Sequence, residues 1–316
     1  MPPLPLNLPL DDAIPALQLL RDRGFDFLLE PVAQKRPFSL HSVLRHHPGK
    51  RCTLSVASGD GLLIFKAYRD AGHLRRAVAV MEALDASAPG RRWATPHLLA
   101  TDPDNAFLVT DAFPGPSAKQ LIASGRGGRA GRAAAAWITA PGLEPPAGQR
   151  PPESPLERAA AMADLIRKES ALLSGPSSAL LRSLAAAVPP QRREVLVHGS
   201  FKPGHIFDVG GAAGLIDWES ARTGAIELDA GCFLAKLSSI KLRHPSQSKA
   251  VDEARRTFIE ETRGTVDPHA LFWYEAFAQL KRAVSASLRP GSRAQEKAKV
   301  LLEAAAGWKA AFPGDV

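Results

Sequence analysis

The sequence predicts an α+β protein in which a small mixed lobe is followed by a large helical lobe. Two β-rich runs, Cys52–Ala57 and Leu62–Tyr68, flank the turn Ser58–Gly61, which has the composition of a hairpin turn. A helical spacing of apolar residues follows, at Leu74, Ala77, Val78, Met81 and Leu84. From Leu156 onward, most of the chain shows the same helical period.

These elements divide the chain into two parts. We assign 1–116 to an N-terminal segment and the small lobe, whose core covers 38–110 and ends in an apolar strand at Phe107–Thr110. Residues 111–117 contain two prolines and a glycine, as expected of an inter-lobe hinge. The large lobe is expected over 118–316.

The large lobe is expected to begin with an insertion. Residues 124–155 are rich in Gly, Arg, Ala and Pro, which predicts a flexible segment with a short alanine-rich helix near Ala133–Trp137. Hairpins are expected over 195–219. Helices are expected at about 156–174, 177–187, 228–242, 247–263, 268–288 and 292–311.

The composition limits the classes of function. Apolar residues make up 45% of the 316 residues. The chain contains no run of about eighteen uncharged apolar residues, so a membrane span is not expected. The proline-rich, acidic N-terminus does not resemble a secretory signal, and Cys52 and Cys232 form no disulfide or zinc pattern, so we expect a reducing cytoplasm. The net charge of +8 favours anionic ligands such as nucleotides. Because the few aromatic residues are not interleaved with arginines, we do not expect nucleic acid binding.

The most informative stretch is Val197–Glu219. It predicts a strand ending in a His-Gly turn, a polar loop, and a hairpin of Ile206–Val209 and Gly214–Asp217 around the turn Gly210-Gly211. An aspartate at the end of an apolar strand is well placed to hold a metal. The alternative for Asp217 is an ordinary strand-end residue that caps the following turn.

This segment resembles the catalytic loop and metal-binding strand of the aminoglycoside phosphotransferase and choline kinase family. Relatives there read roughly His-Gly-Asp, four residues, Asn, and then Ile-Asp-Trp-Glu; this chain has His198-Gly199-Ser200, His205 and Ile216–Glu219. The resemblance covers roughly 38–290. It implies the two-lobed protein-kinase-like fold, a small lobe with an antiparallel sheet and one helix, and ATP with Mg²⁺ or Mn²⁺ as cofactors.

The resemblance assigns roles to several residues. Asp217 would bridge the metal to the nucleotide phosphates, with Glu219 either supporting it or solvated. Lys66, in an apolar strand, would hold the phosphates and pair with Glu82 sixteen residues later. The alternative for Lys66 is a strand-edge residue with its ammonium group in water.

Other roles concern backbone groups and loop supports. Backbone groups near Asp111 and Phe113 would meet the adenine. The segment His46–Lys50 falls where the family has its nucleotide-covering turn, but it is poor in glycine and predicts only a turn. Asp229 would brace the catalytic loop, and His198 would anchor it by hydrogen bonds.

Two departures from the family pattern affect catalysis. Ser200 stands at the position of the catalytic carboxylate, and a serine is neutral at pH 7 and does not accept the acceptor's proton. His205 stands at the position of a metal-binding asparagine, although Mg²⁺ prefers oxygen ligands. His205 could act as a base, bind a softer metal, contact a phosphate or fill space, and Lys202 adds positive charge to the loop.

Two functions follow from these residues. The first is an ATP-dependent phosphotransferase that acts on a hydroxyl of a small-molecule acceptor, with Ser200, His205 and Asp217 at the reaction centre. The second is a weak or inactive relative that binds nucleotide or a protein partner as a regulatory or assembly subunit. Glu260, Glu261 and Glu275 would line the pocket of a cationic acceptor, or belong to solvated helix faces.

Overall fold

The computed structural model describes residues 8–30, 37–59, 61–85, 92–140, 142–146, 154–190 and 193–308. The chain forms two compact units, and each is described by itself. The N-terminal unit comprises Met1–Gly90, Ala94–Pro114 and Gly214–Glu219. The C-terminal unit comprises Arg91–Trp93, Gly115–Ala213 and Ser220–Val316. The chain therefore passes between units at Pro114, within the expected hinge 111–117, and the segment that carries Asp217 belongs to the N-terminal unit.

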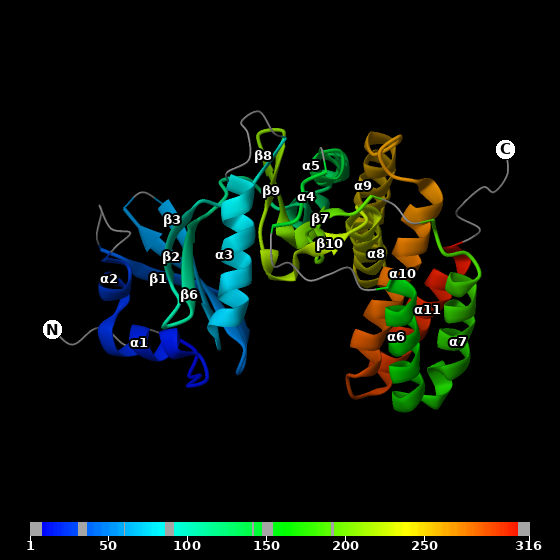
Figure 1. Cartoon of the computed structure of the whole chain (residues 1–316), viewed down its shortest axis with the longest axis horizontal. Helices are drawn as coiled ribbons and strands as arrows, with labels where there is room; N and C mark the ends of the chain where they lie inside the picture. Colours follow the sequence, from blue (N-terminus) through cyan, green and yellow to red (C-terminus); the bar gives the residue numbers. More distant parts are fainter. Residues whose placement is uncertain are drawn as a thin grey trace. The chain divides into compact units, whose positions relative to one another are not determined.

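The N-terminal unit is built on a five-stranded antiparallel sheet of order β1-β2-β3-β6-β5 (Figure 1). Its strands are β1 (Ser39–His47), β2 (Arg51–Ser58), β3 (Gly61–Tyr68), β5 (Leu98–Asp102) and β6 (Phe107–Asp111). The expected strands at 52–57, 62–68 and 107–110 are confirmed as β2, β3 and β6, and Ser58 pairs with Gly61 across the hairpin. The turn expected at 46–50 is also present, since the Lys50 backbone N–H donates to the His47 carbonyl at 3.0 Å.

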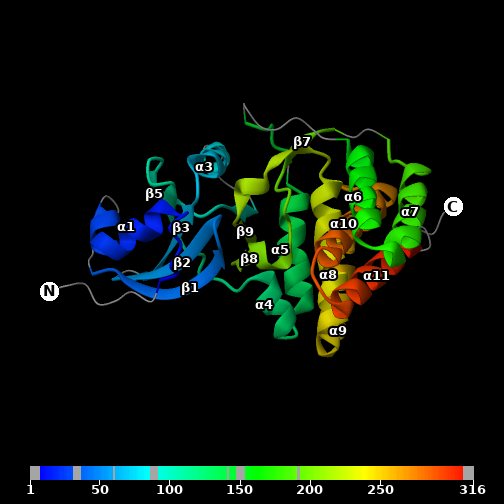
Figure 2. The same cartoon turned by 90° about the horizontal axis from the view of Figure 1, so that it is seen from below.

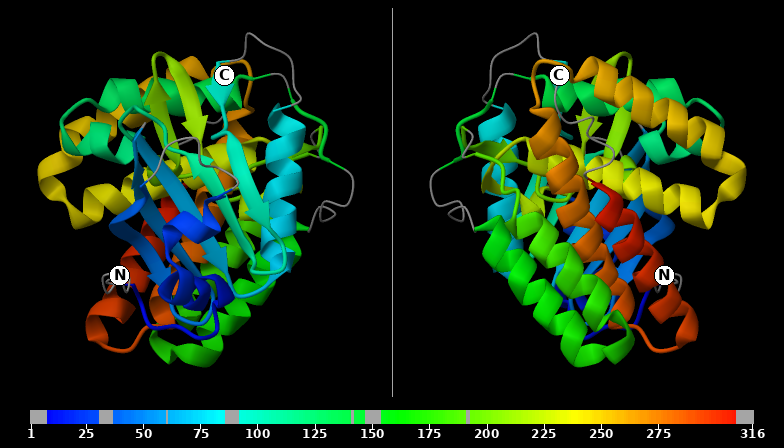
Figure 3. Two further views of the ribbon diagram at one scale, coloured as in Figure 1. Left: turned by 90° about the vertical axis from the view of Figure 1, so that its left-hand side faces the viewer. Right: turned by 90° about the vertical axis from the view of Figure 1, so that its right-hand side faces the viewer.

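Helices cover the two faces of this sheet. The apolar side chains of Leu54, Phe65 and Val109 form one core with α1 (Pro15–Arg23) and α2 (Phe25–Leu28). On the other face, Tyr68 and Leu108 pack with α3 (Ala71–Asp85), the helix expected from the spacing after Leu74 (Figure 3).

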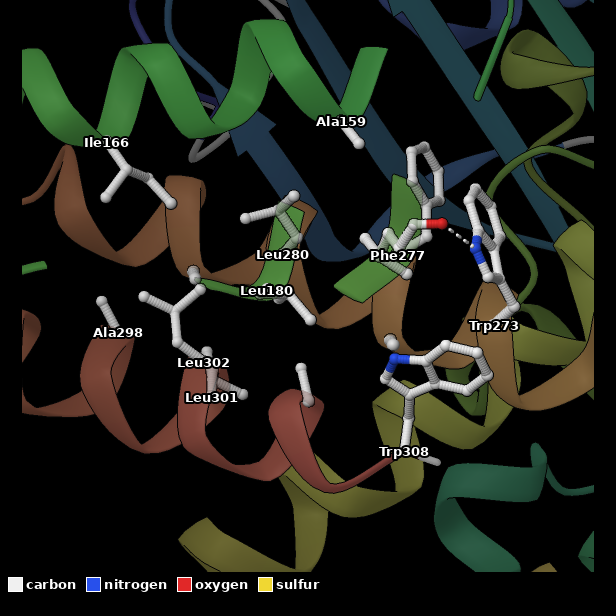
Figure 4. Close-up of a cluster of buried hydrophobic side chains, with 14 of the residues drawn as sticks. Ala159, Ile166, Leu180, Trp273, Phe277, Leu280, Ala298, Leu301, Leu302 and Trp308 are labelled. Carbon is white, nitrogen blue, oxygen red and sulfur yellow. Dashed lines mark hydrogen bonds between the residues drawn. The ribbon is translucent and has the colours of Figure 1, made fainter. Parts of the chain in front are cut away.

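The C-terminal unit is mainly helical (Figure 2). Its helices are α4 (Ala118–Ala123), α5 (Gly127–Ile138), α6 (Pro155–Glu169), α7 (Ala171–Ala185), α8 (Glu227–Arg243), α9 (Ser248–Glu261), α10 (Pro268–Ser287) and α11 (Ser292–Ala306). The helices α6, α7, α10 and α11 share one buried core, in which Trp273 donates its indole N–H to the Leu184 carbonyl at 2.9 Å (Figure 4). Within the described residues, none of the helices has the length and apolar character that crossing a membrane requires.

Short strands complete the structure. β7 (Val195–Val197) pairs with β10 (Arg222–Gly224), and a second small sheet, which includes β4 (Trp93–Ala94), has the order β4-β9-β8. The hairpin partners in it are β8 (Ile206–Val209) and β9 (Ala212–Leu215), joined by Gly210-Gly211, both with positive φ. The expected second strand, Gly214–Asp217, is therefore wrong at both ends, and Asp217 lies beyond the strand.

The short helix expected near Ala133–Trp137 is present as part of a longer helix, but the flexible insertion expected over 124–155 is wrong for most of its described residues. Residues 127–138 form α5, and its Gly127 and Gly131 lie against the backbone of α9: a Cβ at Gly131 would meet the Ala254 carbonyl oxygen at 2.6 Å. The glycines and alanines that suggested low complexity instead allow two helices to approach closely. An ion pair from the exposed Arg129 to the buried Asp208 of β8 adds a further anchor, with Nη2 2.7 Å from Oδ2.

The break expected between the first two helices of the large lobe lies elsewhere. Helix α6 ends at Glu169 and α7 begins at Ala171, so Pro176 lies inside α7. Proline lacks an N–H, so the carbonyl of Leu172 receives no helical hydrogen bond there, but Leu172 is exposed and water can replace the bond.

Candidate functional site: a buried ion cluster and a braced loop

Lys66 lies in the centre of the N-terminal sheet. It occupies β3, opposite Thr53 of β2 and Leu108 of β6, and its side chain is only 12% exposed. Its ammonium group donates to Asp217 Oδ1 at 2.5 Å and also pairs with Glu219. The two residues to which the resemblance gave phosphate and metal roles thus form an ion pair within one unit, although 151 residues separate them in sequence.

Two further residues complete this cluster. Arg51 Nη1 lies 3.5 Å from Asp217 Oδ1 and 3.7 Å from Glu219 Oε2, and the Tyr68 hydroxyl donates to Glu219 Oε1 at 2.6 Å. Burial, followed by the charge of Glu219, raises the pKa of the Tyr68 hydroxyl well above 10, so it stays a donor. Glu219 is not solvated, since its side chain is 6% exposed.

Sequence reasoning missed Arg51 and Tyr68, but the hairpin turn contained the signal. Because Ser58 pairs with Gly61, counting outward places Arg51 opposite Tyr68, two positions beyond Lys66 on the same face of β3. Arg51 therefore brings a second cation close to Lys66 from the neighbouring strand. A site that binds several carboxylates or phosphates needs more than one cation.

The backbone at Asp217 is strained. Its φ of 75° is unusual for a residue that is not glycine, and such conformations cost about 1–3 kcal/mol. The side-chain bonds to Lys66 and Arg51 hold the residue there, and the buried Trp218 donates its indole N–H to the Leu215 carbonyl at 3.1 Å. This anchoring directs the carboxylate toward the two cations.

The predicted partner of Lys66 is wrong. Glu82 lies on the exposed side of α3, whereas Lys66 pairs with Asp217 and Glu219. The apolar face of α3 is formed by Leu74, Ala77, Met81 and Leu84, and position 82 falls outside it. Helical periodicity placed Glu82 at the edge of the apolar face of α3. Because that face packs into the core of the unit, the Glu82 side chain points toward solvent.

The residues predicted near the adenine lie after β6. Asp111 accepts hydrogen bonds at its carboxylate from the His97 backbone N–H and from His97 Nδ1, at 2.8 and 2.7 Å. This partner raises the pKa of His97 above its usual 6.5. The ring of Phe113 lies against Gly214, where a Cβ would be 2.9 Å from the ring. The proposed adenine contacts of Asp111 and Phe113 remain predictions.

The carboxylates of the ion cluster fit a magnesium ion. Asp217 and Glu219 provide hard oxygen ligands within one buried cluster, and Mg²⁺ commonly uses one or two carboxylates together with substrate phosphates. No group of three or more His, Cys, Asp or Glu side chains among the described residues forms an all-protein metal site.

In the C-terminal unit, Asp229 braces the loop His198–His205, which the resemblance expects to be the catalytic loop. This buried carboxylate accepts from the backbone N–H groups of His198 and Gly199 at 2.6 and 2.9 Å, and from the Trp137 indole at 3.1 Å. Gly199 has a φ of 71°, and a Cβ there would lie 2.1 Å from the Ser220 carbonyl oxygen, so only glycine fits. The expected bracing role of Asp229 and the anchoring at His198 are confirmed.

Ser200 and His205 follow this brace. Ser200 is half-buried, and its backbone N–H donates to His198 Nδ1 at 3.4 Å. His205 is buried at the end of a short 3-10 helix, Pro203–His205, with its ring centroid 5.7 Å from that of His198. The roles of Ser200 and His205 in catalysis, and of His205 as a metal ligand, remain predictions.

The comparisons with known proteins agree with this architecture. The model of the phosphotransferase enzyme family matches residues 53–296, more than half of the chain. No curated protein sequence matches. The protein is similar to a thermostable mutant of aminoglycoside phosphotransferase APH(4)-Ia in ternary complex with ADP and hygromycin B, at 16% identity and a TM-score of 0.64, over 90% of this chain and 98% of the other.

Two choline kinase-like structures are also similar. The choline/ethanolamine kinase family protein from Mesorhizobium loti shares 19% identity with a TM-score of 0.54, over 88% of this chain and 89% of the other. Choline kinase LicA from Streptococcus pneumoniae shares 10% identity with a TM-score of 0.59, over 91% of this chain and 98% of the other. The fold is therefore kinase-like, as the resemblance implied, and the chain belongs to the phosphotransferase enzyme family.

Proposed function

We propose that the protein is an ATP-dependent phosphotransferase that acts on a hydroxyl group of a small molecule. The observation that carries this proposal is the buried cluster in which Lys66 and Arg51 meet Asp217 and Glu219. The match to the phosphotransferase enzyme family and the likeness to an ADP-bound structure support nucleotide and Mg²⁺ as the ligands of this cluster. Its two cations would bind the phosphates, and its two carboxylates would bind the metal.

The chain's own residues would provide electrostatic catalysis. Lys66 and Arg51 would exchange part of their ion pairing for phosphate oxygens when nucleotide binds. Asp217 and Glu219 would hold Mg²⁺, which neutralises charge on the phosphates when it is bound. Phosphoryl transfer depends mainly on such positioning and neutralisation, so the proposal does not require a carboxylate at position 200.

A second candidate is a nucleotide-binding protein with little or no transferase activity, acting through a protein partner. Ser200 favours it, since loss of a general base lowers rates by about 10²–10⁴. The two candidates share nucleotide binding and differ in turnover.

A thermal-shift measurement with ATP and Mg²⁺ or Mn²⁺ tests the shared part. At 100 times the dissociation constant, a ligand that binds only the folded state adds about 2.7 kcal/mol. The shift should disappear in Asp217→Asn and persist in the control Asp252→Asn, an exposed carboxylate paired with Lys241. A wild-type protein that shows no shift with either metal would overturn the proposal.

Turnover then separates the candidates. Phosphotransferase function predicts ATP hydrolysis, slow without acceptor, that Asp217→Asn abolishes. Nucleotide binding without hydrolysis, even in the presence of acceptors, would support the second candidate.

A further inference from the structure

A group of basic side chains gathers on one face of α8 in the C-terminal unit. Lys236, Ser239 and Arg243 follow helical spacing and share this face. Arg243 Nε donates to the Ser239 carbonyl at 3.1 Å, and Arg282 Nε of α10 donates to the Ser239 hydroxyl at 2.6 Å. Two guanidinium groups from different helices therefore meet at a single serine.

The same group extends to the catalytic loop. The short helix Pro203–His205, which directly follows Lys202, packs against both α8 and α4. Lys202 and Lys119, the latter in α4, lie close enough for their charges to act on Lys236. We call Lys119, Lys202, Lys236, Arg243 and Arg282 the basic cluster.

Carboxylates do not neutralise the centre of the basic cluster. Among the described residues, none lies within ion-pair distance of Lys236, Arg243 or Arg282. Neighbouring cations of the same unit differ: Lys241 pairs with Asp252, and Arg255 pairs with both oxygens of Glu275.

The pKa values of two members of the basic cluster are lowered by burial and by the positive charges around them. Burial and then the charges of Arg282, Arg243, Lys202 and Lys119 lower the pKa of Lys236 to about 7. Burial and the charge of Arg243 lower the pKa of Arg282 to about 10. The like charges of the half-buried Lys202, Lys236 and Arg282 repel one another, and an anion placed among them would relieve the repulsion.

We propose that the basic cluster binds a phosphate or carboxylate group of the acceptor, so that the substrate class is an anionic small molecule with a free hydroxyl. This inference rests on the proposed function, because it uses the position of Lys202 in the loop that carries Ser200. The expectation of an acidic pocket for a cationic acceptor weakens, since Glu275 is neutralised by Arg255 and Glu260 and Glu261 are exposed.

The geometry favours a small ligand over a nucleic acid. Lys202, Lys236 and Arg282 are half-buried among α8, α10 and the loop, whereas a backbone-tracking surface presents exposed cations. Ser239 also fixes two guanidinium groups in place, which preorganises them for one compact anion.

Glycerol 3-phosphate is a suitable probe because it is a hydroxyl-bearing phosphate ester, with glycerol and KCl of equal ionic strength as controls. Its binding to the full chain can be measured by thermal shift without nucleotide. Lys236→Met should raise its apparent dissociation constant about tenfold or more, and the exposed Arg243→Gln provides a second variant. Lys249→Met on α9 changes the same charge outside the basic cluster and should bind like the wild type.

ATP binding on the same proteins separates this inference from the proposed function. Lys236→Met should keep the ATP shift, whereas Lys66→Met should lose it and still bind glycerol 3-phosphate. No binding beyond the KCl control, or equal binding by the Lys236 and Lys249 variants, would overturn the inference alone. A single-stranded oligonucleotide that binds through Lys236 while glycerol 3-phosphate does not would overturn it in favour of nucleic acid. A wild-type protein without any ATP shift would overturn the proposed function and the acceptor role with it.

Discussion

At the scale of single residues, the ion cluster depends on a few buried polar contacts. Glu219 is 6% exposed and is held by Lys66, Arg51 and the Tyr68 hydroxyl. A buried carboxylate that loses one donor retains the desolvation cost without the bond. The cluster should therefore respond to changes of a single atom.

Removal of the Tyr68 hydroxyl tests this dependence. Tyr68→Phe should lower the free energy of unfolding by about 1–3 kcal/mol, because a hydrogen bond to a charged group is lost. Urea unfolding gives the value. Tyr274→Phe is the matched control, since the Tyr274 hydroxyl makes no hydrogen bond among the described residues. Equal effects of the two substitutions would mean that the Tyr68–Glu219 bond contributes nothing.

Ser200 is the second residue for which a single substitution should change a measurable property, here the rate of turnover. If Ser200 occupies the position of the catalytic carboxylate, as the resemblance expects, Ser200→Asp should raise acceptor-dependent turnover about tenfold or more, part of the factor that a general base provides. Ser200→Ala should stay within about twofold of the wild type, because the serine hydroxyl is a poor base at neutral pH. The coupled release of ADP measures both rates. An aspartate variant no faster than the alanine variant would show that this loop does not limit the reaction.

At the scale of elements, α5 shows how small residues are used. Gly131 faces the α9 backbone at a distance that leaves no space for a methyl group, and Arg129 of the same helix pairs with Asp208. Local composition therefore indicated flexibility where close helix packing is present. Trp137 of α5 also donates its indole N–H to Asp229, so this packing supports the loop His198–His205 that Asp229 braces.

Two alanine substitutions separate propensity from packing. Gly175→Ala in α7 meets no atom within 4 Å apart from its chain neighbours, but its Cβ precedes Pro176, so the clash with the proline ring offsets the gain in helix propensity and the free energy of unfolding should change by less than about 0.5 kcal/mol. Gly131→Ala has the same gain in propensity but should destabilise by about 1–3 kcal/mol, because its Cβ would overlap the Ala254 carbonyl. Thermal or urea unfolding compares them. A stabilising Gly131→Ala would contradict the packing of α5 against α9.

At the scale of the whole molecule, the basic side chains behind the net charge of +8 lie in different surroundings. Some of them pair with carboxylates, as Lys66 does in the ion cluster and Arg255 does in its contact with Glu275. Lys236, with its carboxylate-free neighbours, retains an electrostatic cost in the folded state. This cost makes stability depend on pH in a defined direction.

The pKa of Lys236, lowered from 10.5 to about 7 on folding, sets the sign. Between these two values the unfolded chain binds more protons than the folded chain, so this residue makes the free energy of unfolding rise as pH rises. Lys236→Met should therefore be more stable than the wild type near pH 7, and the difference should diminish toward pH 10. Denaturant titrations across this range measure it. A difference that does not change with pH would show that Lys236 is not perturbed by Arg282, Arg243, Lys202 and Lys119.

The sequence by itself determined the strands β2, β3 and β6 and the helices α8, α9, α10 and α11, because periodicity and turn residues encode them directly. Tertiary structure alone decided that Glu82 faces solvent, that Glu219 and Arg51 join the ion cluster, and that the glycine-rich segment is a buried helix. It also decided that basic side chains from α4, α8, α10 and the loop that carries Lys202 lie together. Such contacts join residues distant in the chain, and their energies depend on burial and on neighbouring charges, which no local pattern of residues records.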